Sequence, residues 1–195
     1  MSDPVPPGKL RSIVTYLEMT APPTRAPRPG PLEHAALLRA EDCTVSFYRY
    51  LYGTVGEPWL WWYRRTLPDA ELAAIVQDPK VQIYVLYLRG VPAGYVELDR
   101  RETGICDLAY FGLMPEFIGR RLGPWFLDKA LDMAWSGPGT EKVTVNTCTL
   151  DHPKALLTYQ RAGFKPVEQE TQHIDDPRLA GILPRDAAPH VPLAL

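Results

Sequence analysis

The residues best suited to chemistry lie at 113–125, where LMPEFIGRRLGPW connects a predicted strand to a predicted helix. Gly119 and Gly123 let the backbone turn tightly, so that several amide groups can converge on one point, and a proline suited to the first helical turn follows. Converging amides at the positive end of a helix dipole bind phosphate groups. Arg120 and Arg121 add positive charge at the same place. The segment therefore predicts a phosphate-binding loop, and a plain loop with two solvated arginines is the alternative.

A second segment, residues 151–164, places a tyrosine on a predicted helix that ends at Gly163. Ala155, Tyr159 and Ala162 have helical spacing and share one face, which would pack against a sheet. A tyrosine hydroxyl is protonated at neutral pH and can donate a proton to a basic leaving group. The alternative is a core tyrosine with its hydroxyl at the rim of the core.

The elements that position these segments follow from the spacing of the apolar residues. Nearly continuous apolar and β-branched runs predict an antiparallel meander of three strands, at residues 81–88, 93–99 and 105–113. The chain then alternates between helix and strand, with a helix at 124–135, a strand at 142–150 and a last strand at 167–174. Before the meander we expect a strand at 12–20, helical pieces over 32–52 that include Leu32, and a helix at 69–76 with Asp69 as its N-cap. This order predicts an α/β (α+β) fold with a mixed, mainly antiparallel central sheet flanked by helices.

Composition limits the classes of function. The 195 residues suit one domain, and 21 Lys and Arg against 23 Asp and Glu give no positive excess for nucleic acid or an acidic membrane surface. Apolar stretches are too short for a membrane-spanning helix, and residues 1–10 do not resemble a secretion signal. Cys43, Cys106 and Cys148 fit neither a disulfide framework nor a metal site, so we expect no bound metal and a reducing, cytoplasmic location.

Proline divides the chain into three parts. Of the 21 prolines, 12 lie in residues 1–31 and 177–195, so both ends are predicted to be extended. We expect a strand and a proline-rich arm over residues 1–31, a folded domain over 32–175 and a proline-rich tail over 176–195. Apolar residues in the ends would be buried in a homodimer, and frayed ends are the alternative.

Together the two segments resemble the GNAT superfamily, the N-acetyltransferases that use acetyl-CoA. The loop motif of that family reads roughly V-x-P-E-[YF]-[QR]-G-x-G-x-[GA], and the residues in register with it are Leu113, Pro115, Glu116, Phe117, Gly119, Leu122 and Gly123. The family's later motif, N-x-x-A-x-x-L-Y-x-x-x-G-F, is matched by Ala155, Tyr159, Gly163 and Phe164. The chain departs from these motifs at Ile118, Arg121 and His152. The resemblance implies a GNAT domain over residues 32–175.

The resemblance also implies roles for single residues. The diphosphate of acetyl-CoA would be held by the loop Ile118, Gly119, Arg120, Arg121, Leu122 and Gly123, and its pantetheine arm would pair with the strand at Leu113. Tyr159 would protonate the leaving thiolate. Asp107 is the first candidate for the base that removes a proton from the acceptor amine, and Glu97 is the second.

The acceptor side is indicated by a cluster of aromatic residues that includes Trp59, Trp61 and Trp62. In the family, this part of the chain forms one wall of the acceptor site, and aromatic walls suit an apolar or cationic small molecule. We therefore expect transfer of an acetyl group from acetyl-CoA to a primary amine of a small molecule. The alternatives are a non-catalytic CoA-binding regulatory module and an acyltransferase that acts on a protein amine.

Overall fold

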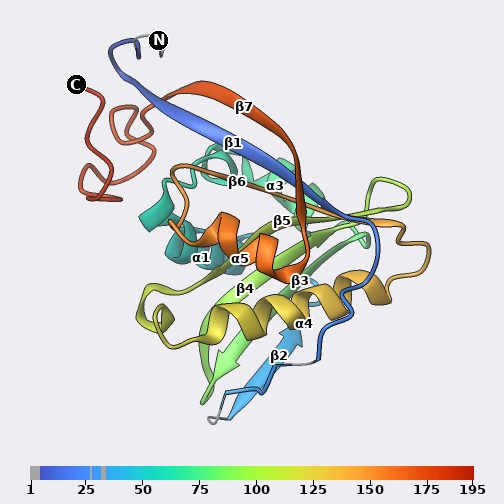
Figure 1. Ribbon diagram of the computed structural model, residues 1–195. Coiled ribbons are helices and arrows are strands. Elements are labelled where there is room, and N and C mark those ends of the chain that lie inside the picture. Colours follow the sequence, from blue (N-terminus) through green and yellow to red (C-terminus); the bar gives the residue numbers. More distant parts are fainter. Residues whose placement is uncertain (1–4, 27, 32–33) are drawn as a thin grey trace.

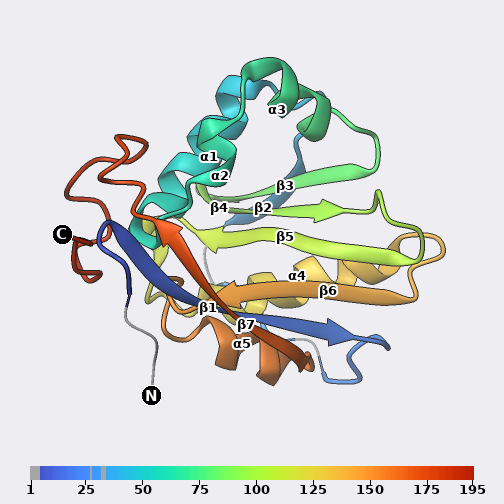
Figure 2. The ribbon, with the colours of Figure 1, turned by 90° about the horizontal axis from the view of Figure 1, so that it is seen from above.

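A computed structural model describes residues 5–26, 28–31 and 34–195 of the chain, and predictions for Leu32 lie outside these residues. Seven strands form one sheet in the order β2-β3-β4-β5-β6-β1-β7 (Figures 1 and 2). The strands are β1 Lys9–Met19, β2 Ala35–Arg39, β3 Val81–Leu88, β4 Val91–Asp99, β5 Ile105–Leu113, β6 Lys142–Cys148 and β7 Lys165–Asp175. Every neighbouring pair is antiparallel except β5 and β6, which confirms the mixed, mainly antiparallel sheet.

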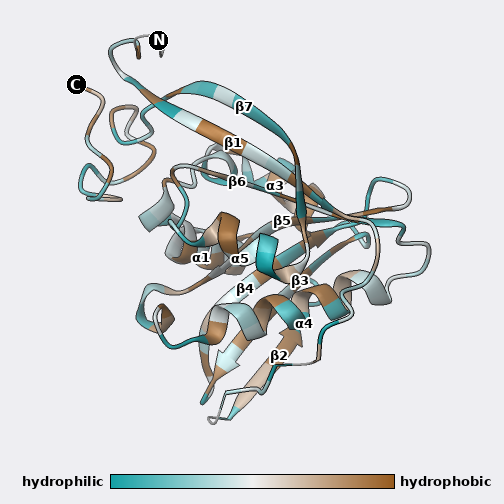
Figure 3. Ribbon diagram, viewed as in Figure 1, coloured by the Kyte–Doolittle hydropathy of each residue, from teal (hydrophilic) through white to brown (hydrophobic). Residues whose placement is uncertain are grey.

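Helices cover both faces of the sheet (Figure 2). They are α1 Val45–Gly56, α2 Tyr63–Thr66, α3 Asp69–Val76, α4 Leu122–Ser136 and α5 Ala155–Ala162, with 3-10 turns η1 Glu57–Trp59 and η2 Pro115–Phe117. One core lies between the sheet and α4 with α5, and a second lies between the sheet and α1 with α3. The edge strand β7 is mostly polar and exposed (Figure 3). In the described chain, no helix is long and apolar enough to cross a membrane.

The sheet opens in its middle, between β5 and β6. These parallel strands pair only at Ile105↔Lys142, Cys106↔Val143 and Asp107↔Thr144 in the described chain. Beyond Asp107, β5 continues along β4 up to Leu113, whereas β6 continues along β1. The two halves of the sheet therefore separate toward the loop that precedes α4.

The helical prediction for residues 32–52 is wrong in its first half. Ala35–Arg39 is an edge strand, β2, that pairs with Tyr84–Leu88 of β3. Because β2 is largely exposed, its residues lack the alternating burial that marks a strand, and the spacing of its small apolar residues resembled a helix. The helix α1 follows as predicted, with Thr44 as its N-cap.

The prediction of a helix over 69–76 is confirmed, but Asp69 is its first residue and not its N-cap, which is Pro68. The carboxylate of Asp69 instead accepts a hydrogen bond from Arg49 Nη2 at 2.7 Å. An acidic side chain in the first turn still interacts favourably with the helix dipole.

The N-terminal part of the chain is integrated into the domain. β1 lies between β6 and β7, and the proline-rich connection after it runs along the outer side of α4 (Figure 1). There Arg28 Nη1 donates to the carboxylate of Asp128 at 2.6 Å, and Arg25 forms a second ion pair with the same carboxylate. Gly30 packs against the indole of Trp125. The connection thus wraps around the domain.

Residues 176–195 fold onto their own chain, so they are neither an extended arm nor a frayed end. Arg178 and Asp176 form a buried ion pair of 2.7 Å. The guanidinium of Arg178 also donates to main-chain carbonyls of the tail, among them that of Val191 at 2.7 Å. A small apolar core joins the tail to the domain and contains Leu10, Leu60, Leu150, Leu183, Ala187 and Ala188. Hydrogen bonds from this one guanidinium satisfy carbonyl groups of the tail that regular secondary structure would otherwise satisfy. The burial of the tail in a homodimer stays a prediction.

Candidate active site

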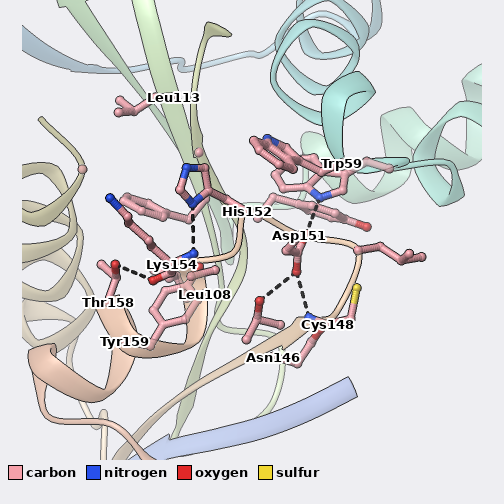
Figure 4. Close-up of a pocket in the computed structure, with 18 of the residues that line it drawn as sticks. Trp59, Leu108, Leu113, Asn146, Cys148, Asp151, His152, Lys154, Thr158 and Tyr159 are labelled. Carbon is pink, nitrogen blue, oxygen red and sulfur yellow. Dashed lines mark hydrogen bonds between the residues drawn. The ribbon is translucent and has the colours of Figure 1, made fainter. Parts of the chain in front are cut away.

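A cavity of about 560 Å³ fills the opening between β5 and β6. Its walls come from the separated strands, the loop before α4, the inner face of α5, and the chain from η1 to α2 (Figure 4). Nearly all of the residues predicted for the site line this one cavity, namely Leu113, Ile118, Gly119, Arg121, Leu122, Gly123, Trp59, Trp61, Trp62 and Tyr159. Three predicted residues, Arg120 and the two candidate bases Asp107 and Glu97, are not part of its lining.

One end of the cavity is formed by the loop before α4 and by the first turn of that helix. The first amide groups of α4 have no partner within the helix, and they begin at Leu122. Gly119 has φ +84, a conformation that favours glycine, and a Cβ added there would meet no atom within 4 Å. The backbone of this loop is therefore open to a ligand, and its geometry fits the diphosphate of acetyl-CoA.

Arg121 lies directly before α4 and has φ +60, in the left-handed region. Side chains with a Cβ rarely adopt this conformation, and it costs roughly 1 kcal/mol. The loop keeps the shape that a glycine would give it, and it carries a guanidinium beside the cavity in addition. Arg120 differs, because its guanidinium stacks over the ring of Phe117 at 4.9 Å.

The edge of β5 borders the cavity near Leu113. On its other side this strand still pairs with β4, at Gly94↔Leu113 and Tyr95↔Gly112. The side that β6 has left carries main-chain groups that need hydrogen-bond partners. An extended ligand with amide groups, such as a pantetheine arm, could pair there as an added strand.

Tyr159 on α5 is 7% exposed and lines the cavity. Its ring packs against Phe111 and Phe164. The described residues provide no hydrogen-bond partner for its hydroxyl, which leaves this group available to a ligand. Burial raises the pKa of Tyr159, and the negative charges of Asp151 and Asp107 raise it further, so the hydroxyl stays protonated.

The other end of the cavity is aromatic. The ring of Trp61 packs against Tyr110 at 5.1 Å and against Tyr52 at 5.5 Å between centroids. The ring of Trp59 contacts the rings of His152 and His190 edge-on, at 5.1 and 5.4 Å between centroids. Trp61 also packs tightly against Gly56, where a Cβ would lie 2.5 Å from the indole. These contacts fix the rings of the wall in place.

The sequence profile of the acetyltransferase (GNAT) family matches residues 46–164 of the chain, which is more than half of it. The chain belongs to the GNAT acetyltransferase family. No curated protein sequence matches this GNAT chain. The loop at residues 113–125 and Tyr159, which carry the resemblance in the sequence, lie within the matched region.

Solved structures of GNAT proteins share the fold. A GCN5-related N-acetyltransferase from Kribbella flavida superposes with a TM-score of 0.58 and 18% identity, over 89% of this chain and 63% of its own. An aminoglycoside acetyltransferase from an uncultured soil metagenomic sample, in complex with trehalose, superposes with a TM-score of 0.52 and 16% identity, over 66% of this chain and 87% of its own. The aminoglycoside N-acetyltransferase AAC(6')-Iy, in complex with CoA, superposes with a TM-score of 0.50 and 18% identity, over 74% of this chain and 94% of its own. At these identities the likeness establishes the fold, and this GNAT chain spans 63% of the length of the Kribbella protein.

The two carboxylates predicted as the base lie elsewhere in this GNAT domain. Asp107 accepts a hydrogen bond of 2.6 Å from Thr144 Oγ1 and borders a second hollow, together with Asp99 and Glu102. Burial raises the pKa of Asp107, and the hydrogen bond from Thr144 only partly opposes this. Its prediction as the base has no support from this geometry, because Asp107 and Tyr159 do not line the same cavity.

Glu97 is fully buried beneath the aromatic wall. It accepts a hydrogen bond of 2.8 Å from Arg64 Nη2 and another from the hydroxyl of Tyr48. Burial raises the pKa of Glu97, although Arg64 and Tyr48 oppose that effect. With both oxygens engaged, Glu97 holds Arg64 beneath the rings and is not free to take a proton from a ligand.

Asp151 was missed by the sequence reasoning, although it opens the segment in which Tyr159 was found. The three donors around its carboxylate are Trp61 Nε1 at 3.1 Å, Thr147 Oγ1 at 2.8 Å and the amide of Cys148 at 2.9 Å. Figure 4 shows Asp151 at the turn after β6, on the aromatic side of the cavity. Its position two residues before Pro153 suggested only a helix start, since nothing local indicates that a tryptophan 90 residues away donates to it.

Proposed function

We propose that this protein is an N-acetyltransferase that moves an acetyl group from acetyl-CoA to a primary amine of a small molecule. The observation that carries the proposal is that the loop before α4, the protonated Tyr159 and the aromatic residues Trp59, Trp61 and Trp62 line one cavity. Membership of the GNAT family supports acetyl-CoA as the donor.

On the donor side, the loop from Ile118 to Gly123 would hold the diphosphate through its amide groups, with Arg121 adding charge. The free edge of β5 at Leu113 would pair with the pantetheine arm. AAC(6')-Iy, a protein of the same fold, was solved in complex with CoA, which supports a CoA ligand. Tyr159 on α5 would then face the thioester sulfur of the bound acetyl-CoA.

On the chemical side, the neutral amine attacks the thioester carbonyl carbon, the carbon–sulfur bond breaks, and the sulfur takes up a proton. Tyr159 supplies a hydrogen bond and then this proton, and it regains one from solvent after the amine nitrogen has lost its own. Because burial keeps the pKa of Tyr159 above its ordinary value, the tyrosine is ready to donate at any physiological pH.

A small acceptor is favoured over a protein amine by the C-terminal segment, which packs beside the aromatic end of the cavity. Leu60 and Leu150 line the cavity and pack against Leu183 and Ala187 of the folded C-terminal segment. His190 of that segment contacts Trp59 as well. The names of two solved relatives of the same fold, both aminoglycoside acetyltransferases, also support a small-molecule acceptor. The described cysteines are free thiols, which supports the proposal that the protein works in a reducing compartment such as the cytoplasm.

The proposal is tested by calorimetry with acetyl-CoA, followed by a thiol-release assay over a panel of primary amines. We expect the wild-type protein to bind acetyl-CoA and Gly119→Val to bind at least tenfold more weakly, because valine disfavours φ +84 and fills the open backbone. Absence of binding by folded wild-type protein would refute the proposal. Binding without thiol release from any amine would instead support the non-catalytic module.

A further inference from the structure

The cavity contains one acidic side chain among the described residues that line it, and that side chain is Asp151. Its Oδ2 atom accepts hydrogen bonds from Thr147 and Cys148, whereas Oδ1 accepts a single bond, from Trp61. A carboxylate offers about four acceptor positions, so Oδ1 can accept one more donor. Three donors from the protein fix the group in place and leave that position for a ligand.

Aromatic residues line the same cavity as this carboxylate. Trp61 donates to it, and the ring of Trp61 packs against Tyr110 and Tyr52. Trp59 contributes a further ring of the same wall. An organic cation gains from a carboxylate and from aromatic faces within about 6 Å, whereas a neutral molecule of the same shape gains mainly from burial.

The basic groups of the cavity lie toward its other end. Arg121 is at the start of α4, and Lys154 lies on the other side of His152 from Asp151 (Figure 4). Arg64 lies beneath the rings, where Glu97 balances its charge. The cavity is therefore basic where an anionic donor would bind and acidic and aromatic where an acceptor would bind.

His152 is not a competing proton acceptor for the ligand. Its Nδ1 atom accepts the amide hydrogen of Lys154 at 3.1 Å, which places the ring hydrogen of the neutral form on Nε2. Burial lowers the pKa of His152, and the charges of Lys154 and His190 lower it further, so the ring is neutral. Asp151 remains the group in this part of the cavity that can pair with a cation.

We propose that Asp151 and the rings of Trp59 and Trp61, which line the same cavity, form a subsite for an organic ammonium ion, and that the acceptor is an amine with an apolar body. This inference rests on the proposed function, because it assigns the acceptor side of the same cavity. Asp151 acts as a specificity-determining residue that selects and orients the cation.

The test compares benzylammonium with benzyl alcohol, which has nearly the same shape and no charge. Binding is followed by tryptophan fluorescence without acetyl-CoA, because Trp59, Trp61 and Trp62 line the cavity. We expect the wild-type protein to bind the cation at least tenfold more tightly than the alcohol. The variant Asp151→Asn should reduce this ratio to about threefold or less, because the amide keeps the size of the side chain and removes its charge.

The matched control is Asp132→Asn, which removes one negative charge from the exposed side of α4, outside the cavity, and should keep the wild-type ratio. Equal wild-type affinities for the two probes would overturn the inference without any variant, and so would an unchanged ratio in folded Asp151→Asn. Calorimetry with acetyl-CoA on the same samples separates the two proposals. If the wild-type protein binds acetyl-CoA but does not prefer the cation, only the proposed ammonium subsite is refuted. If the folded wild-type protein does not bind acetyl-CoA, the proposed function is refuted.

Discussion

Replacing Tyr159 with phenylalanine isolates the hydroxyl group on which the proposed chemistry depends. The ring packs against Phe111 and Phe164, and these contacts survive the substitution. Because the described residues give the hydroxyl no hydrogen-bond partner, its removal should change the free energy of unfolding by less than about 1 kcal/mol. Binding of acetyl-CoA should also persist, since the anion-binding loop is unchanged.

The size of the catalytic effect follows from the environment of the hydroxyl. A positioned general acid contributes about 10² to 10⁴ in rate, and the contribution is greatest when its pKa lies near the working pH. Burial raises the pKa of Tyr159 away from that optimum, so we expect the lower end, about 100-fold in kcat. That factor corresponds to about 2.7 kcal/mol of transition-state stabilisation.

The pH dependence gives the prediction its sharpest form. A tyrosine with a raised pKa remains protonated as the pH rises, so Tyr159 should produce no alkaline decline in kcat between pH 7 and about 10. The assay is thiol release with the best acceptor from the amine panel, measured over this range for wild type, Tyr159→Phe and Tyr84→Phe. Tyr84 is the matched control, since it loses a hydroxyl that bonds Gln82 on β3, outside the cavity. Turnover of Tyr159→Phe within twofold of wild type would refute the reasoning, as would an alkaline decline below pH 10 that the variant lacks.

Two further predictions concern the C-terminal segment and the loop before α4. Arg178→Met should lower the free energy of unfolding by about 3–5 kcal/mol in urea denaturation, because it leaves the buried carboxylate of Asp176 without its partner. Burial alone would raise the pKa of Asp176, but hydrogen bonds from Arg178 lower it overall. The contribution of this ion pair to wild-type stability should therefore be present above about pH 4 and be lost as the pH falls through the lowered pKa. A decrease in the free energy of unfolding of less than about 1 kcal/mol in Arg178→Met at pH 7 would contradict this. Arg121→Gly should raise the free energy of unfolding by up to about 1 kcal/mol, since glycine tolerates φ +60. The same variant should bind acetyl-CoA more weakly in calorimetry, since a positive charge is lost. Unchanged affinity for acetyl-CoA would exclude Arg121 from the donor site.

Local patterns in the sequence were sufficient for the elements that carry the motifs. Continuous apolar runs predicted β3, β4 and β5, and the glycines and prolines at helix ends predicted α4 and α5, since these signals depend on neighbouring residues alone. The edge strand β2 was misjudged because an exposed edge strand has no strong apolar alternation. The loop at Gly119 and the tyrosine at position 159 were recognisable for the same reason as the strands, since each depends on a short, ordered motif.

Tertiary structure alone decided what faces the cavity. The separation of β5 and β6 after Asp107 is a property of two strands with different neighbours, and Asp107, which the family resemblance suggested as the base, lines a second hollow. The pairing of Asp151 with Trp61 joins segments 90 positions apart, and the folding of the C-terminal segment around Arg178 depends on carbonyls that no local pattern reveals. A sequence specifies such contacts only through the whole fold, because the partners are brought together by packing and not by their spacing along the chain.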